Sequence, residues 1–369
     1  MRSTLWAPRS VVIPPMSRPR PRPRRLVLAS MAASVAMGQQ GYEAHLADAL
    51  TRVAGTGWEV RTCRVRSLRS RAAGERRLPL EAVGSLPTLA GRWIGRATYG
   101  RAAVVHRLDL RIPPPAAPEV LTVHDLAPLR FADEGRLPRN WQASVRGAAA
   151  VVVPSAFTAA ELEEITGVRA VVITHAHDPE LVGAAPLGDD ALATLGISRP
   201  YILHAGGATE RKNLAALAGA WAVVRSERPD ATLVLCGPPD ARRDRHFAAL
   251  PGTVRPGRLD RPTLVGLLCG AALVVVPSTY EGFGLPALEA LTAGVPVVAS
   301  DRGSLPEVVG DAGLLVEPTG PGLAEGILAT LADPEGAAAR AARGRARARE
   351  RSWDDVAADH LDLYRRVAG

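Results

Sequence analysis

The sequence predicts an α/β protein of two doubly wound domains, in each of which helices cover a parallel sheet. Short apolar runs bounded by turn residues alternate with segments of helical periodicity, as they do in such folds. The alternation stops over residues 184–199 and starts again after Pro200. A length of 369 residues is enough for two domains with separate cores. We therefore expect one domain over residues 26–185, a second over 199–351, and a last helix over 352–369 that returns to the first.

Each half of the chain supplies its own predicted elements. In the first half, strands are predicted at Leu26–Ser30, Ala103–His106, Val120–His124, Ala149–Val153 and Ala170–Thr174, and helices at Gln40–Val53 and Thr158–Thr166. In the second half, strands are predicted at Tyr201–Ala205, Thr232–Cys236, Ala271–Pro277 and Pro296–Ser300, and helices at Asn213–Arg228, Arg261–Cys269 and Leu285–Ala293. Ligands of doubly wound sheets bind beyond the carboxyl ends of the strands, so the loops after these runs are where a site is expected.

The composition indicates a globular, cytoplasmic protein. The chain is 47% hydrophobic and 22% charged, which is typical of folded domains. Its aromatic share of 4% is too low for a surface that stacks the bases of single-stranded nucleic acid. The three cysteines form no Cys-x-x-Cys pair, which fits a reducing cytosol and argues against a zinc site. The sequence contains no run of about 18 apolar residues that could span a membrane.

The net charge of +8 comes from the amino-terminal tail. Residues 1–25 hold seven arginines and no acidic residue, which leaves +1 for residues 26–369. We expect this tail to be disordered and solvated, with Met16 as an alternative start and attachment to an anionic surface as a functional alternative. Because the rest of the chain is nearly neutral, nucleic-acid binding through the tail is kept as an alternative function and not as the main prediction.

The loop after the predicted strand Tyr201–Ala205 has the chemistry of a diphosphate site. Gly206 and Gly207 permit close backbone approach. Arg211 and Lys212 add two positive charges just before a helix N-terminus, where free amides also favour an anion. Lys212 is the single lysine among 45 basic residues, which favours a local role for it. A solvated turn before an amphipathic helix is the alternative.

The loop after the predicted strand Ala271–Pro277 carries two carboxylates at a second helix N-terminus. Glu281 precedes the helix, and Glu289 lies about one turn inside it. Carboxylates placed in this way can hold sugar or ribose hydroxyls by charge-assisted hydrogen bonds. A buried capping glutamate together with a surface glutamate is the alternative.

Together these motifs resemble those of the family 4 retaining glycosyltransferases, the glycosyl transferases group 1. The resemblance rests on Arg211-Lys212-Asn213, Gly237-Pro238, Glu281-Gly-Phe-Gly-Leu-Pro with Glu289, Gly294–Ser300 and Leu305–Gly310, in that order. It is strongest over residues 200–318 and continues through Thr122–Asp125, Val153–Thr158 and Ser352-Trp353. The resemblance implies the GT-B fold, in which two Rossmann-like domains face each other across a cleft, with the acceptor on the first and the nucleotide-sugar donor on the second.

The resemblance also implies roles for individual residues of the second domain. Arg211 and Lys212 would hold the donor diphosphate and stabilise the nucleoside diphosphate as it leaves. Glu281 would contact the transferred sugar, and Glu289 the donor ribose. The rest of the donor pocket would come from Gly206, Gly207, Gly282, Phe283, Gly284 and Leu285, with Gly257 and Arg258 beside the nucleobase.

In the first domain, His124 and Asp125 end a predicted strand at the edge that would face the cleft. The resemblance places His124 at the sugar, whereas a lone His-Asp pair is commonly structural. Gly38 and Gly41 belong to a segment that resembles the family's glycine-rich loop near the acceptor and the donor phosphates, although it departs from the usual Gly-x-Gly form.

A second departure from the family pattern lies at Thr174–Asp178, where relatives show Pro-Asn-Gly-x-Asp. His175 and His177 stand two residues apart there. Two imidazoles without a third ligand make a weak metal site, so we expect a hinge-side loop near the acceptor and assign no metal.

The sequence contains no Asp-x-Asp pair, with which many other glycosyltransferases hold a metal. We therefore expect an enzyme without metal or cofactor, in which Arg211, Lys212 and helix-terminal amides stabilise the leaving diphosphate. The resemblance implies retention of the anomeric configuration. A hexose, with mannose from GDP-mannose favoured, would move to a glycan or lipid-linked acceptor in cell-envelope polysaccharide biosynthesis. A GT-B-like sugar-nucleotide epimerase is the alternative enzyme.

Residues 86–101 predict a basic amphipathic helix on the first domain, with Leu89 and Trp93 among the apolar residues and Arg92 and Arg96 among the basic ones. Such a helix can contact an anionic membrane, which would place the protein at the inner face of the cell membrane. A surface helix whose apolar side packs on the sheet is the favoured interpretation, and membrane contact is kept as its alternative.

Overall fold

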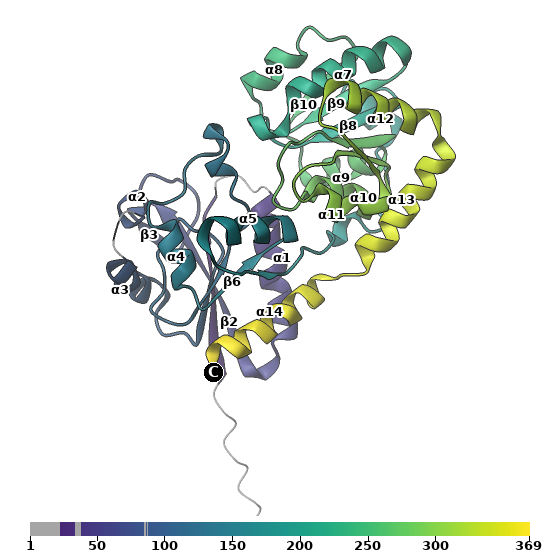
Figure 1. The fold of residues 1–369 in the computed structure, drawn as a ribbon. Coiled ribbons are helices and arrows are strands. Elements are labelled where there is room, and N and C mark those ends of the chain that lie inside the picture. The colour runs from purple at the N-terminus through teal and green to yellow at the C-terminus, as the bar shows by residue number, and fades with distance from the viewer. Residues whose placement is uncertain (1–22, 34–37, 85, 87) are drawn as a thin grey trace, which may run out of the picture.

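The computed structural model describes residues 23–33, 38–84, 86 and 88–369, which form two α/β domains around two parallel sheets (Figure 1). The first sheet has seven strands in the order β3-β2-β1-β4-β5-β6-β7, and the second has six in the order β10-β9-β8-β11-β12-β13. This architecture confirms the predicted fold class. The predicted disordered tail covered residues 1–25, of which residues 1–22 lie outside the described residues. Arg24 and Arg25 are not part of a disordered tail, because they begin the first strand, β1, and pair in parallel with Trp58 and Glu59.

The first domain contains the following elements. Its strands are β1 (Arg24–Met31), β2 (Trp58–Ser67), β3 (Arg76–Leu78), β4 (Val104–Arg107), β5 (Glu119–Thr122), β6 (Ala150–Val153) and β7 (Val171–Val172). Its helices are α1 (Gly38–Val53), α2 (Leu80–Val83), α3 (Thr88–Tyr99), α4 (Trp141–Gly147) and α5 (Ala156–Thr166), with 3₁₀ turns that include η3 (Ala132–Glu134) and η4 (Pro179–Leu181).

The second domain follows a short helix, α6 (Asp189–Thr194), within the segment where the sequence pattern stops. Its strands are β8 (Tyr201–Ala205), β9 (Thr232–Cys236), β10 (Thr253–Gly257), β11 (Leu273–Val276), β12 (Val297–Ser300) and β13 (Leu314–Val316). Its helices are α7 (Leu214–Glu227), α8 (Ala241–Phe247), α9 (Arg261–Cys269), α10 (Leu285–Ala293), α11 (Leu305–Val309), α12 (Gly320–Ala332) and α13 (Pro334–Arg349), with the 3₁₀ turn η5 (Glu210–Lys212) before α7.

The central strands are apolar because helices cover both faces of each sheet. Every residue of β11 is buried, as is nearly every residue of β8. The edges of the sheets differ from the prediction. The predicted strand Ala170–Thr174 is reduced to the two exposed residues of β7, and β2 was not predicted because charged residues interrupt its apolar ones.

The last helix, α14 (Trp353–Ala368), leaves the second domain and lies along α1 of the first (Figure 1). A capping box fixes its start, since Ser352 and Asp355 each accept a hydrogen bond from the other's backbone amide. Its buried face adds Trp353 and Tyr364 to the core that contains Tyr42 of α1. The chain therefore passes between the domains twice, once after β7 and once after α13.

Candidate active site

A cleft of about 1030 Å³ lies between the two domains, at the carboxyl ends of strands from both sheets. It is lined by residues that follow β5 in the first domain and β8 and β11 in the second. The predicted site residues line this cleft, except for Gly257, which ends β10 with a φ of 77° just before the lining residue Arg258. The fold thus brings the predicted donor and acceptor residues to one place.

Glu281 and Lys212 form a buried ion pair in this cleft. The Nζ of Lys212 lies 2.6 Å from Oε1 of Glu281, which also accepts a 2.7 Å hydrogen bond from the hydroxyl of Ser278. Burial would raise the pKa of Glu281, but the charges of Lys212 and Arg211 outweigh it and lower this pKa to about 2. Glu281 is therefore a carboxylate at neutral pH.

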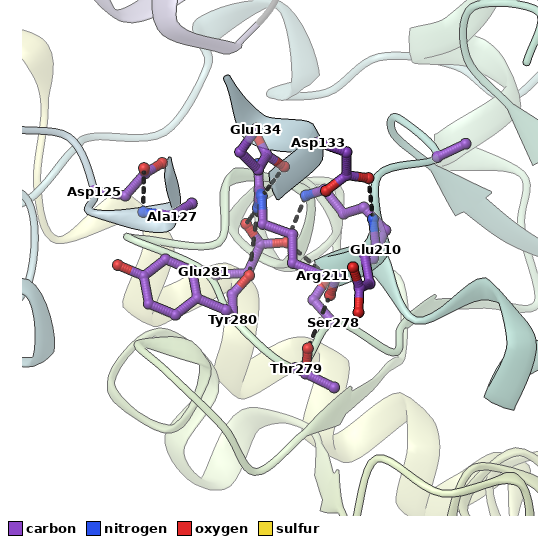
Figure 2. Close-up of polar contacts among 12 residues, drawn as sticks. Asp125, Ala127, Asp133, Glu134, Glu210, Arg211, Ser278, Thr279, Tyr280 and Glu281 are labelled. Atoms are coloured by element: carbon purple, nitrogen blue, oxygen red, sulfur yellow. Dashed lines mark hydrogen bonds and ion pairs between the residues drawn. The ribbon is translucent and has the colours of Figure 1, made fainter. Parts of the chain in front are cut away.

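Arg211 lies between carboxylates from the two domains (Figure 2). One terminal nitrogen is 2.8 Å from Oε2 of Glu281, and Nε is 2.5 Å from Oε1 of Glu134, the last residue of η3. Beside this contact, a carboxylate oxygen of Asp133 accepts a 2.8 Å hydrogen bond from the backbone N–H of Glu210. The cationic turn of the second domain is thus held by an acidic turn of the first.

Asn213 fixes the turn that carries Arg211 and Lys212. Its φ of 53° lies in the left-handed region, which asparagine tolerates better than most residues. Its side-chain amide donates hydrogen bonds of 3.0 Å to the carbonyl of Pro277 and 2.8 Å to that of Pro318. These bonds connect the cationic turn to the segments after β11 and β13, so the positions of both cations depend on the sheet.

The N-terminus of α10 opens into the cleft, and no side chain of the described residues caps it. Its N-cap is Gly284, whose φ of 98° suits a residue without a Cβ. The helix N-terminus provides amides and a positive dipole end to an anion. Opposite it, a Cβ on Gly38 would lie 2.7 Å from Leu285, so the start of α1 contacts the start of α10 across the cleft.

Glu289 projects into the same cleft from α10 and contacts Arg261 at 3.2 Å. Arg261 also pairs with Asp178 and Glu180 from the segment that connects the domains. Burial raises the pKa of Glu289 despite the charge of Arg261. One cation of the second domain, Arg261, thus joins three carboxylates.

His124 follows β5 and is enclosed on the first-domain side of the cleft. Burial lowers its pKa to about 4, so the imidazole is neutral at pH 7. Its Nε2 has no hydrogen-bond partner among the described residues. A Cβ on Gly282 would lie 2.2 Å from the carbonyl oxygen of His124, which shows how closely the two domains approach here. Asp125 lies beside it and accepts a 3.0 Å hydrogen bond from the backbone amide of Ala127.

His175 and His177 have separate surroundings. The ring of His175 is buried between Tyr42 and Phe283, with both ring centroids 4.5 Å from its own. The Nδ1 of His177 lies 3.0 Å from the carbonyl oxygens of both Ala348 and Arg351. His177 therefore joins the two segments that pass between the domains, while His175 packs in the cleft.

Further bonds join the loop that contains Glu281 to the first domain. The hydroxyl of Tyr280 donates to Glu161 at 2.6 Å and accepts from the backbone amide of Leu126 at 2.9 Å. The carbonyl of Gly282 accepts from the hydroxyl of Ser155 at 2.6 Å. The described structure is therefore a closed arrangement of the two domains.

Several residues that shape the cleft were not predicted as site residues, among them Asp133, Glu134, Tyr280 and Arg261. Their contacts join segments far apart in the sequence, and no local motif marks them. The one usable signal was that Asp133 and Glu134 follow the His124-Asp125 strand end, and so belong to the same edge of the sheet.

Comparisons with known proteins agree with this geometry. A family model described as glycosyl transferases group 1 matches residues 199–333. An alpha-maltose-1-phosphate synthase of Mycolicibacterium smegmatis is 33% identical over 291 residues, which cover 68% of this chain and 73% of that protein. An O-antigen chain mannosyltransferase B of Escherichia coli is 37% identical over 100 residues, which cover 27% of this chain and 26% of that protein. The structure of a sucrose-phosphate synthase from Thermosynechococcus elongatus, 25% identical, has a TM-score of 0.73 and covers 93% of this chain and 99% of its own.

Proposed function

Since the chain belongs to the glycosyl transferases group 1, the family 4 glycosyltransferases of GT-B fold, we propose that it transfers a hexose from a nucleotide sugar, with retention of configuration and without a metal. The observation that carries the proposal is the placement of Arg211 and Lys212 beside the open N-terminus of α10. Two cations and a helix N-terminus provide the positive potential that a diphosphate leaving group requires.

On this proposal, each part of the cleft binds one part of the donor. The diphosphate lies against Arg211, Lys212 and the backbone of Gly206 and Gly207. The hexose lies at Glu281 and at the amides of residues 282–285. The ribose lies at Glu289 and the nucleobase near Gly257 and Arg258.

The acceptor side is proposed to lie on the first domain, at Gly38, Gly41, His124 and Asp125. A neutral imidazole can donate one hydrogen bond and accept another, and Nε2 of His124 is without a partner among the described residues. We assign it to a sugar hydroxyl. The bond from the anomeric carbon to the diphosphate breaks as the acceptor oxygen attacks from the same face, and the acceptor proton passes to the departing phosphate.

For the donor, we propose GDP-mannose, which is supported by the similarity to the O-antigen chain mannosyltransferase. The acceptor is proposed to be a glycan or a lipid-linked sugar of the cell envelope. The test is calorimetric titration of GDP-mannose, UDP-glucose and UDP-N-acetylglucosamine in the presence of EDTA, into the wild type and into Lys212→Ala. Arg349→Ala, an exposed cation on α13, is the control.

Micromolar binding of GDP-mannose that Lys212→Ala weakens at least ~10-fold, about 1.4 kcal/mol, is the expected result. Binding of a uridine donor instead would replace the mannose assignment and leave the phosphate site intact. Binding of no donor, or equal loss in the control, would contradict the proposed function. Turnover of the donor without any acceptor would indicate the epimerase alternative.

We further propose that α3 contacts an anionic membrane surface. No helix in the part of the chain that the structure describes is long and apolar enough to cross a bilayer. However, α3 exposes Leu89 (74%) and Trp93 (75%), and its buried side is formed by residues such as Tyr99. The apolar side of this helix therefore does not pack entirely on the sheet. Flotation with phosphatidylglycerol vesicles, but not with phosphatidylcholine vesicles, is expected and should be lost in Leu89→Ser/Trp93→Ser.

A further inference from the structure

Arg211 is one of the two cations proposed to bind the diphosphate. In the structure it forms an ion pair with Glu134, a carboxylate of the first domain. Nε of Arg211 lies 2.5 Å from Oε1 of Glu134, and the two side chains are only 15% and 18% exposed (Figure 2). Glu134 also lines the cleft itself. A carboxylate in this position makes the contact with Arg211 that a phosphate oxygen would make.

The two cations are paired with two carboxylates: Arg211 and Lys212 contact Glu281, and Arg211 also contacts Glu134. The carboxyl of Asp125 adds a further acidic group close to Arg211. Glu281 cannot give up its partners easily, because it is buried and holds both cations. A diphosphate would bring further negative charge to the same cations. Glu134 is the carboxylate whose departure would remove a competing negative charge from Arg211.

The remaining contacts of the acidic turn allow Glu134 to leave Arg211 while the turn stays in place. Asp133, its neighbour, pairs with Arg242 and accepts the 2.8 Å hydrogen bond from the amide of Glu210. Neither bond involves Arg211. A change in the side-chain rotamers of Glu134 would therefore release Nε of Arg211, while a terminal nitrogen of the guanidinium stays on Glu281.

We propose that Glu134 sets the affinity for the donor by exchanging with its diphosphate on Arg211. Before the donor binds, the carboxylate of Glu134 holds the guanidinium in position. When the donor binds, the diphosphate replaces Glu134, and when the nucleoside diphosphate leaves, Glu134 returns to Arg211 and competes against rebinding. The inference rests on the proposed function, because it requires that the cleft binds a nucleoside diphosphate. It makes Glu134 a positioning residue that acts through Arg211.

The test measures binding of GDP and UDP, without metal, to Glu134→Gln and Glu134→Ala. Glutamine keeps the shape of the side chain and removes its charge. The control is Glu163→Gln, which removes the carboxylate of an exposed ion pair with Arg169 on the same domain. Guanosine and uridine serve as ligands of the same bases without phosphate, and circular dichroism checks that each variant is folded.

Both variants of Glu134 are expected to lower the Kd of the nucleoside diphosphate roughly fivefold or more, because a competing negative charge is gone. Binding of the nucleoside should not change, and the control should match the wild type. An unchanged or raised Kd in Glu134→Gln would overturn the inference. If the wild type binds the diphosphate and Arg211→Ala does not, that result would leave the proposed function intact. Absence of binding by the wild type would overturn both.

Discussion

Replacing Lys212 by methionine is expected to destabilise the second domain by about 3 kcal/mol. The pKa of Glu281 is about 2 rather than the ordinary 4.5, although burial acts in the opposite direction. At ~1.4 kcal/mol for each pKa unit, its two cations and its hydrogen bonds favour the carboxylate by about 3 kcal/mol beyond the cost of burial. Methionine keeps most of the apolar length of lysine and removes its charge. Glu281 then remains buried with Arg211 as its remaining ion-pair partner, so we expect a loss near the lower end of the about 3–5 kcal/mol that an unpaired buried charge costs.

The assay is urea unfolding followed by tryptophan fluorescence, to which Trp221, a buried residue of the second domain, contributes. The variants are Lys212→Met, Glu281→Gln and the double variant. The double variant should lose less than the sum of the single losses, because it leaves neither charge unpaired. Arg228→Met, which removes the cation of a partly exposed ion pair with Asp230, should change the free energy of unfolding by less than ~1 kcal/mol.

The same variant has an expected pH dependence. A carboxyl whose pKa is lowered by folding contributes stability that is present above pH 4.5 and is lost as the pH falls through about 2. In Lys212→Met the folded-state pKa of Glu281 rises, so less of this stability is present and its loss, which again starts near pH 4.5, is complete at a higher pH than in the wild type.

In the cycle of Lys212→Met, Glu281→Gln and the double variant, losses that add within about 0.5 kcal/mol would refute the coupling of the pair.

Three further outcomes can be checked directly. Transfer activity should persist in EDTA, and an activity that is lost there and restored by magnesium would contradict the assignment of the leaving-group charge to side chains. Gly282→Ala should reduce kcat/KM at least ~100-fold, because its Cβ would lie 2.2 Å from the carbonyl oxygen of His124. The control is Gly219→Ala, whose Cβ meets open space and which should match the wild type. Burial lowers the pKa values of His124, His204 and His360 to about 4. Between pH 6.5 and pH 4 these histidines are therefore protonated in the unfolded chain but neutral in the folded one, so the Tm should fall over this range. A constant Tm would count against their burial as neutral groups.

The sequence was most informative where one physical cause dominates. The central strands β8 and β11 could be predicted because a strand covered on both faces must be apolar. By contrast, β2 pairs between β1 and the edge strand β3, and its sequence from Trp58 to Ser67 mixes charged and apolar residues. Its position in the sheet, and not its composition, makes it a strand.

In the candidate site, too, the residues marked by a local sequence pattern could be predicted, and those defined by a distant contact could not. Lys212 was identified because it is the one lysine of the chain and lies in a glycine-containing loop, and Glu281 was identified because its motif is local. Glu134 could not be identified in this way, since its contact with Arg211 joins positions 77 residues apart and exists only when the two domains meet. Motifs can indicate the donor residues of one domain, but they do not show which residues of the other domain contact them.

The return of α14 to the first domain has a consequence for the order of events during synthesis. All strands of the second sheet, from β8 to β13, are contiguous in the chain, so they leave the ribosome before α14 does. The strands of the first domain are synthesised earlier, but the core that contains Tyr42 is complete only when Trp353 and Tyr364 of α14 pack into it. At the far end of that helix, the guanidinium of Arg24 donates a 3.0 Å hydrogen bond to the carbonyl of Gly369, so the beginning of β1 meets the end of the chain. Of the two domains, the one that is translated earlier is therefore the one whose core is completed later.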